Sequence, residues 1–381
     1  MKFVIAPDSF KESMSAHDAC VAMEKGIREV FPTAECVKIP MADGGEGTVE
    51  ALVAHTGGRI METEVIGPTG QKVVAKYGIS GDGHTAIMEM ASASGIQLVA
   101  KQDRNPLHTT SYGTGQLLQH ALNHHVKTIL LGIGGSVTND GGAGMMQALG
   151  VSLLDRDGME LPFGGVNLKK LHSIDRSKMD PRLRHVHIQV ACDVTNPLLG
   201  PNGASYTFGP QKGATPEMVE QLEESLTHFA KVVESQLGIK IADIPGGGAA
   251  GGLGAGLIAF LNAELKKGVE LVVEQTGLEK QIIGADYVFT GEGSIDGQTL
   301  FGKTPYGVAS IAKKHQVPVI AFSGKVGADV DTLYDSGFTA IIGILREVTS
   351  LDIALSKGSD NLAFSVENVC RLIQQARSIS K

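Results

Sequence analysis

Residues 128–150, TILLGIGGSVTNDGGAGMMQALG, constrain the fold of this chain more than any other stretch. They begin with an apolar, β-branched run that is typical of a short buried strand. A glycine-rich loop with hydroxyl, amide and carboxylate groups follows, and then a segment of helical composition, AGMMQAL. A strand, a glycine-rich loop and a helix N-terminus together present backbone N–H groups and the positive end of a helix dipole to an anion.

This arrangement predicts a phosphate-binding or nucleotide-binding loop. The structural alternative is a tight turn that packs against a neighbouring helix. The loop favours the first interpretation because it holds more glycines and polar groups than a turn alone requires. The residues predicted to hold phosphate are Gly134, Gly135, Ser136, Thr138, Asn139, Gly141 and Gly142.

Composition places the chain among ordinary globular proteins. Its 381 residues are enough for two domains, each with a sizeable core. The net charge of −8 and the sequence pI near 5.8 argue against nucleic acid or an anionic membrane as a partner. The 49 glycines are nearly twice the usual share of about 7%, and they are clustered.

Cysteine usage and the N-terminal sequence indicate a cytoplasmic protein. The four cysteines are scattered and show no CxxC spacing, as expected of reduced core residues. The apolar run in MKFVIAPDSF is too short for a signal peptide, and no apolar segment approaches the roughly 20 residues that span a bilayer.

The order of expected elements predicts an α/β fold with two domains. Strands and helices alternate at the beginning of the chain and again after residue 287, which favours a parallel sheet. Between residues 62 and 91 the pattern is that of hairpins with glycine turns. We therefore predict a flavodoxin-like parallel-sheet domain made from both chain ends, residues 1–65 and 282–381. A second α/β domain with a mixed sheet, residues 66–281, is inserted in it, and a cleft between the two is the expected ligand site.

Several predicted strands end in loops that combine carboxylates, glycines and hydroxyls. Because ligands of open α/β sheets bind at the carboxyl ends of the strands, these loops are expected to form one site. Carboxylates near phosphate-binding loops are what magnesium–nucleotide chemistry requires. The predicted metal-binding residues are Asp43, Glu292 and Asp296.

Two other motifs are weaker. The sequence GQTLFGKT, residues 297–304, matches the Walker A pattern, but six residues separate it from the preceding strand and no Walker B strand stands out. We interpret the match as accidental. His120, His124 and His125 have a spacing that permits zinc binding on a helix, but a solvated helix face is favoured.

Seven motifs together resemble the bacterial type I glycerate kinases. They are IAPDSFKES, ADGGEGT, IGGSVTNDGGAGM, CDVTNPL, FGPQKGA, PGGGAAGGLGAG and TGEGSIDGQTLFGK, in this order along the whole chain. One departure is Val137, where alanine is usual, and it affects packing only. The resemblance implies a two-domain α/β enzyme that phosphorylates D-glycerate with ATP and Mg²⁺ in glyoxylate or sugar-acid breakdown. It implies 2-phosphoglycerate as the usual product, with 3-phosphoglycerate as the alternative.

The resemblance and the loops together give predicted roles. The general base is Asp193, with Asp140 as second choice, and Lys11 is a further catalytic residue. Lys11 or Lys212 is expected to pair with the glycerate carboxylate. The predicted substrate-binding residues are Asp8, Ser9, Lys212 and Asn196. Besides the loop described above, the residues predicted to bind ATP are Gly247, Gly248, Gly251, Gly252 and Lys303.

Two other functional classes are weighed against this kinase. One is a non-catalytic module that binds a phosphorylated metabolite, which the density of carboxylates disfavours because they repel phosphate unless a metal intervenes. The other is a P-loop NTPase. The expected partners are D-glycerate and ATP, without nucleic acid or membrane, and the one assembly considered is a homodimer.

Overall fold

The computed structural model describes residues 1–45 and 47–379, so Glu46 of the predicted 43–48 loop lies outside the described residues. The chain divides into two compact units. Unit 1 comprises Met1–Asp43, Glu50–Thr56 and Gly268–Lys381, and unit 2 comprises Gly44–Val49 and Gly57–Lys267. Within the described ranges, no helix has the length and apolar character needed to cross a membrane.

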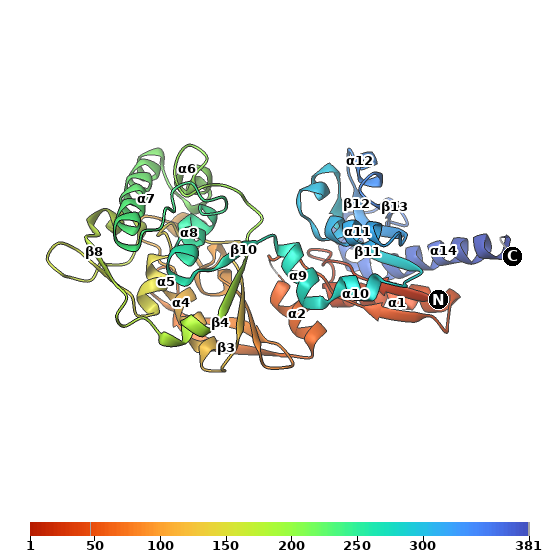
Figure 1. Cartoon of the computed structure of the whole chain (residues 1–381). Coiled ribbons are helices and arrows are strands. Elements are labelled where there is room, and N and C mark those ends of the chain that lie inside the picture. The colour runs from red at the N-terminus through yellow and green to blue at the C-terminus, as the bar shows by residue number, and fades with distance from the viewer. Residues whose placement is uncertain (46, 380–381) are drawn as a thin grey trace. The chain divides into compact units, whose positions relative to one another are not determined.

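Unit 1 contains a five-stranded parallel sheet in the order β13-β12-β11-β1-β2. Numbered along the chain, this is the order 2-1-3-4-5 of flavodoxin-like folds, as predicted. The first and last described elements both belong to this unit (Figure 1). Its elements are β1 (Lys2–Ile5), α1 (Ala16–Val30), β2 (Glu35–Lys38), α2 (Thr48–Thr56, which begins in unit 2), α9 (Gly268–Thr276), α10 (Leu278–Ile282), β11 (Tyr287–Ile295), η6 (Gly297–Phe301), α11 (Thr304–Lys314), β12 (Val319–Val326), α12 (Asp331–Tyr334), β13 (Phe338–Gly343), α13 (Leu351–Ser356) and α14 (Gly358–Ile379).

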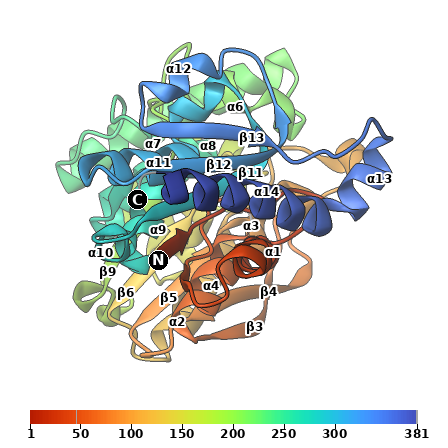
Figure 2. The ribbon, with the colours of Figure 1, turned by 90° about the vertical axis from the view of Figure 1, so that its right-hand side faces the viewer.

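Helices α1 and α14 pack against each other in unit 1 (Figure 2). Helix α1 begins after Ser15, whose hydroxyl caps it by accepting a hydrogen bond from the Asp18 N–H at 3.1 Å. The two helices approach closely at Gly26, where a Cβ atom would lie 2.3 Å from the Ala363 carbonyl oxygen. Their apolar faces complete the core over the strands that carry Phe3 and Phe289.

Unit 2 contains a six-stranded mixed sheet in the order β10-β9-β6-β5-β4-β3. Strands β3, β4 and β5 are antiparallel, as the hairpin pattern predicts, and β5, β6, β9 and β10 are parallel. Its elements are β3 (Arg59–Ile66), β4 (Lys72–Ile79), β5 (Thr85–Glu89), α3 (Ala91–Ser94), η1 (Ile96–Leu98), η2 (Lys101–Asp103), α4 (Tyr112–Leu122), β6 (Thr128–Gly132), α5 (Ala143–Ala148), β7 (Ser152–Leu154), η3 (Gly165–Lys170), β8 (Ser173–Asp175), η4 (Pro181–His185), β9 (His187–Ala191), α6 (Ala204–Phe208), η5 (Pro210–Lys212), α7 (Pro216–Leu237), α8 (Ala249–Leu261) and β10 (Glu264–Lys266).

The boundaries between the two units lie at residues 43/44, 49/50, 56/57 and 267/268, whereas the predicted domain limits are 65/66 and 281/282. The difference arises because β3 pairs with β4 in the unit 2 sheet and α9 packs on α11 in unit 1. The predicted division into two separately folding domains stays a prediction.

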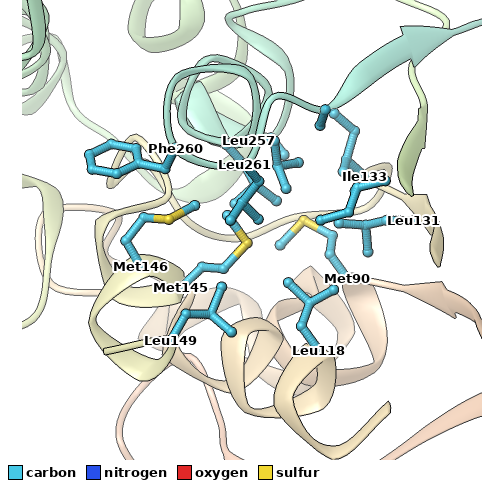
Figure 3. Close-up of a cluster of buried hydrophobic side chains, with 14 of the residues drawn as sticks. Met90, Leu118, Leu131, Ile133, Met145, Met146, Leu149, Leu257, Phe260 and Leu261 are labelled. Atoms are coloured by element: carbon cyan, nitrogen blue, oxygen red, sulfur yellow. The ribbon is translucent and has the colours of Figure 1, made fainter. Parts of the chain in front are cut away.

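The core of unit 2 joins α5 and α8 to strand β6. Met145 and Met146 of α5 point toward Leu257 and Phe260 of α8 (Figure 3), and all four side chains are buried. Local sequence sets both ends of α7. The Thr215 hydroxyl caps it by accepting a hydrogen bond from the Met218 N–H at 3.3 Å, and Gly238 ends it with φ +73°.

The first turn of α8 is unusual because its backbone is left-handed. Ala250, Gly251 and Gly252 have φ values of +55°, +68° and +91°. This path brings α8 against the loop that follows β6. A Cβ atom on Gly251 would lie 2.1 Å from the Thr138 carbonyl oxygen, and one on Gly256 would lie 2.4 Å from the Gly141 carbonyl oxygen. Glycine is therefore required here for backbone-to-backbone packing.

This packing gives a test with a matched control. Gly251→Ala is expected to destabilise unit 2 by at least about 3 kcal/mol, because the methyl group meets the Thr138 carbonyl. Gly238→Ala also places alanine at a positive φ, but nothing lies within 4 Å of its Cβ position, so it is expected to cost only about 1 kcal/mol. The measurement is urea unfolding of the full chain. Equal losses for the two variants would contradict the packing argument.

Candidate active site

The loop after β6 has an exposed first half. Gly134 and Gly135 are exposed, whereas Ser136, at the inner end of this half, is buried with 7% of its surface exposed. The Gly135 carbonyl accepts the Ile96 N–H at 2.8 Å, which fixes the loop on the neighbouring segment. Within the described part of the chain, none of the N–H groups of Gly134, Gly135 and Ser136 donates to an acceptor. Three successive open N–H groups at a strand end form an arrangement that binds anions such as phosphate.

The second half of the loop is buried and organised by Asp140. One carboxylate oxygen accepts the Ser111 N–H and hydroxyl, both at 2.8 Å, and the Gly144 N–H at 3.2 Å. The other accepts the Gly142 N–H at 3.2 Å. Burial raises the pKa of Asp140, and these hydrogen bonds oppose that rise. Asp140 therefore caps the N-terminal ends of α4 and α5 and holds the loop on them.

The glycines predicted from the 245–256 stretch lie beneath this loop. Gly247, Gly248, Gly251 and Gly252 are all buried. Gly247, Gly248 and Gly252 donate their N–H groups to the carbonyls of Ile244, Asn196 and Gly248. The Gly251 carbonyl accepts the Gly141 N–H at 2.9 Å. The structure therefore gives these glycines a packing role, and their contact with ATP stays a prediction.

Two carboxylates flank the exposed half of the loop at the same edge of the sheet. Gly132, the last residue of β6, is paired in register with Glu89 of β5 on one side and with Ala191 of β9 on the other. Asp193 follows β9 and is exposed. Glu89 is half-buried and accepts the Val49 N–H at 3.4 Å. Asn196, in contrast, anchors the next turn by donating to the Asn202 carbonyl at 2.8 Å.

Unit 1 has a separate cluster of carboxylates at the ends of β1 and β11. The Asp8 N–H donates to the Gly291 carbonyl at 2.8 Å, which places Asp8 beside Glu292. Burial raises the pKa of Asp8 from 3.8 to about 6, and the negative charge of Asp43 contributes to this rise. The Thr304 hydroxyl opposes the rise because it donates a hydrogen bond to the Asp8 carboxylate. Burial likewise raises the pKa of Glu292 from 4.5 to about 7, Lys303 opposes this rise, and Asp8 and Asp43 add to it. The cluster therefore concentrates negative charge.

This cluster fits Mg²⁺ bound together with phosphate rather than a site made by the protein alone. Among the described residues, no group of three or more His, Cys, Asp or Glu side chains is arranged to hold a metal ion. Mg²⁺ usually takes only one or two carboxylates and completes its shell with water and substrate phosphates. Asp8, Asp43 and Glu292 supply such oxygen ligands, and a cation would relieve the repulsion that raises the pKa values of Asp8 and Glu292.

The remaining predicted residues of unit 1 lie around this cluster. The Lys303 ammonium group lies 3.4 Å from a Glu292 oxygen and donates to the Ser294 carbonyl at 3.2 Å. Asp296 caps η6 by accepting the Gln298 N–H at 2.9 Å. Lys11 is exposed, and its backbone lies beside Gly293. The Ser9 N–H donates to Asp8 at 2.6 Å.

Sequence reasoning missed several residues of these sites. Thr304 lies in the Walker-like match that we interpret as accidental, so its hydroxyl was not considered as a partner of Asp8. Glu89 was also missed, although it follows the same pattern as Asp193, a carboxylate at the end of a strand, and that signal could have found it. Ser111 carries no such signal, because only the fold brings it to Asp140.

The raised pKa of Glu292 predicts how stability changes with pH in the absence of divalent ions. Because the folded-state pKa is above the unfolded one, the folded state holds the proton more tightly, and stability falls as pH rises from about 4.5 to about 7. Glu292→Gln removes this loss and is expected to stabilise the metal-free protein at pH 8 by about 1–3 kcal/mol. Urea unfolding at pH 5 and pH 8 with EDTA measures it, with exposed Glu50→Gln as control. A Glu292→Gln variant that loses stability at pH 8 would contradict the assignment.

Comparisons with known proteins agree with this architecture. Residues 3–374 match the model of a family described as the glycerate kinase family. The chain is 52% identical over 373 residues to a glycerate kinase of Haemophilus influenzae, covering 98% of this chain and 99% of that protein. It is also 52% identical over 369 residues to a glycerate 2-kinase of Escherichia coli, covering 97% of each.

A solved structure has the same fold. The crystal structure of a protein of Salmonella typhimurium LT2 assigned as glycerate kinase 2 superposes with a TM-score of 0.92, at 49% identity and with 99% of both chains covered. The family match and the relatives each extend over nearly the whole chain. The chain therefore belongs to the glycerate kinase family.

Proposed function

We propose that the chain transfers the γ-phosphoryl group of ATP to D-glycerate in a Mg²⁺-dependent reaction that gives 2-phosphoglycerate and ADP. The observation that carries the proposal is the row of open N–H groups at Gly134, Gly135 and Ser136, which suits a triphosphate. Membership of the glycerate kinase family supports the acceptor, and the glycerate 2-kinase relative supports the product.

The roles of the residues follow from where each lies in its own unit. The loop at 134–136 binds the triphosphate of ATP. One or two of the carboxylates of Asp8, Asp43 and Glu292 would hold Mg²⁺, which would supply charge neutralisation for the phosphates. Lys303 balances the charge of Glu292, and Lys11 and Ser9 bind the glycerate carboxylate. Asp140 organises the loop instead of acting as a base, since its oxygens already accept four hydrogen bonds.

Asp193 is the proposed general base. It accepts the proton of the attacking glycerate hydroxyl as the new O–P bond forms, and the bond from the γ-phosphorus to the β,γ-bridging oxygen breaks to release ADP. The proposal extends to a cytoplasmic role in glyoxylate or sugar-acid breakdown, which family membership supports. Homodimer formation stays a prediction.

A coupled assay tests the reaction and its product. ATP, D-glycerate and Mg²⁺ are supplied with enolase, pyruvate kinase and lactate dehydrogenase, but without phosphoglycerate mutase. We expect NADH loss beyond that of a control without enolase, because enolase consumes only 2-phosphoglycerate. Formation of ADP with no enolase-dependent signal would point to 3-phosphoglycerate. Absence of glycerate-dependent ADP formation would contradict the kinase proposal. In the same assay, Asp193→Asn is expected to lower kcat by about 10²- to 10⁴-fold, and near-normal turnover would exclude it as the base.

The open N–H groups are tested by two substitutions at one position. Gly134→Ala keeps the N–H, and nothing lies within 4 Å of its Cβ position, so its KM for ATP should stay near that of the unaltered protein. Gly134→Pro removes the N–H and is expected to raise the KM for ATP about tenfold, the effect of one lost charge-assisted hydrogen bond. Indistinguishable KM values for the two variants would argue against phosphate binding by this loop.

A further inference from the structure

Lys212 is a buried lysine in the interior of unit 2. It ends η5 and is only 1% exposed, and its ammonium group donates to the Thr138 carbonyl at 2.6 Å. Burial lowers its pKa from 10.5 to about 7, and the nearby Asp140 carboxylate opposes this fall. Burying an ammonium group is costly unless it is paired. A side chain held in this way has a defined partner in the fold and is not placed to reach solvent.

The backbone around Lys212 fixes where its ammonium group lies. Its N–H donates to the Gly209 carbonyl at 3.0 Å. Gly213 follows with φ +94°, and a Cβ atom there would lie 2.5 Å from the Arg104 carbonyl oxygen. The turn is therefore packed directly against the backbone at Arg104, and it presents Lys212 to the loop after β6 in one position.

The loop is anchored on both sides of Thr138, and Lys212 holds the carbonyl of Thr138 itself. Within the described residues, the Lys212 ammonium group donates to the Thr138 carbonyl, and Thr138 Oγ1 and Asn139 Oδ1 are buried without a hydrogen-bond partner. The Asn139 amide nitrogen donates to the Ser205 hydroxyl at 3.2 Å. Asp140, the next residue, is attached to α4 and α5 as described above. On the other side, Gly251 packs against Thr138 without donating to it. Removing the ammonium group would leave the Thr138 carbonyl buried and unpaired, which favours a change of loop path.

Thr138 is only two residues from Ser136, the last of the three residues with open N–H groups. Val137 lies between them, and its N–H and carbonyl are bonded to the Ser94 carbonyl at 3.1 Å and to the Thr109 hydroxyl at 3.0 Å. Together with the bond from Lys212 to Thr138, these contacts form the base from which the exposed half of the loop extends.

We propose that Lys212 is a positioning residue, which holds the Thr138 carbonyl and so keeps the N–H groups of Gly134, Gly135 and Ser136 directed toward the triphosphate of the nucleotide. It contacts neither glycerate nor ATP, in contrast to the substrate-binding role that the sequence suggests. The inference rests on the proposed function, because it takes the 134–136 loop as the triphosphate site.

The test is the pair of KM values of Lys212→Met in the full-length chain. Methionine nearly matches the length of lysine, and replacing a buried charge with an apolar side chain of similar volume is often neutral for stability. We expect the KM for ATP to rise at least tenfold, while the KM for D-glycerate changes by less than twofold. A selective rise of the KM for glycerate would show contact with the acceptor and overturn the proposal. Unchanged KM values for both substrates would overturn it as well.

Two further measurements make the result specific. Val233→Ala removes buried volume from α7 of the same unit without changing the loop, so it is expected to lower the melting temperature and leave both KM values unchanged. If Lys212→Met does not yield folded protein, Lys212→Gln is measured in the same way. Its amide retains a donor for the Thr138 carbonyl, so a smaller but still selective rise of the KM for ATP is expected, and the absence of that selectivity overturns the proposal.

The Gly134 variants separate failure of this inference from failure of the proposed function. If Gly134→Pro raises the KM for ATP and Lys212→Met does not, the loop binds the nucleotide but Lys212 does not position it. If Gly134→Pro has no effect relative to Gly134→Ala, the loop is not the triphosphate site and the inference is wrong, whereas the kinase reaction itself is decided by the coupled assay.

Discussion

Direct packing of one backbone segment on another is the constraint on which unit 2 depends. The loop after β6 and the left-handed turn that opens α8 touch through main-chain atoms, with the Gly141 N–H bonded to the Gly251 carbonyl at 2.9 Å. Side chains at Gly251 and Gly256 would occupy the space of carbonyl oxygens. The turn that opens α8 packs against the second half of the loop and fixes it in the interior. The first half does not take part in this packing, and its N–H groups donate to no acceptor among the described residues. The exposure of the first half of the loop, on which the proposed anion binding depends, thus goes together with close packing of the second half.

The buried half of the loop carries opposite charges on its two sides. Asp140 attaches it to the N-terminal ends of α4 and α5, and Lys212 holds the carbonyl of Thr138. Each charge alone would be unfavourable in the interior, and each has hydrogen-bond partners that compensate for part of that cost. The carboxylates of unit 1 are different. Burial and the nearby Asp43 raise the pKa values of Asp8 and Glu292. Carboxylates placed together in this way lower the stability of the metal-free protein but suit the binding of a cation.

Much of the fold can be predicted from local patterns. Helical periodicity and the caps Ser15, Thr215 and Gly238 predict α1 and α7, and the order of strands and hairpins predicts both sheets. The rule that ligands bind at the carboxyl ends of strands also leads to Asp8, Asp193 and Glu292. The fold predictions succeed because each depends on residues that are close together in sequence or on one general property of parallel sheets, whereas the roles of Asp8, Asp193 and Glu292 stay predictions.

The sites are harder to predict where glycine and charge have two possible uses. Glycine allows a backbone to approach either a phosphate or another backbone, and the sequence of the 245–256 stretch does not distinguish these two uses. In the structure, Gly248 and Gly251 lie against backbone carbonyl oxygens. Lys212 resembles a surface cation in sequence, and only the fold shows it under Thr138. The contact between Thr304 and Asp8 joins the two ends of the chain, so no local pattern contains it.

The central claim is that the N–H groups of Gly134, Gly135 and Ser136 bind the triphosphate of ATP. It is tested most directly by millisecond quench-flow hydrogen–deuterium exchange of the full chain, with and without Mg²⁺ and a non-hydrolysable ATP analogue. The account predicts that exchange at residues 134–136 slows markedly when the nucleotide is present, while the exposed turn at residues 81–82 does not change. Slower exchange elsewhere in the chain, with residues 134–136 unaffected, would contradict it.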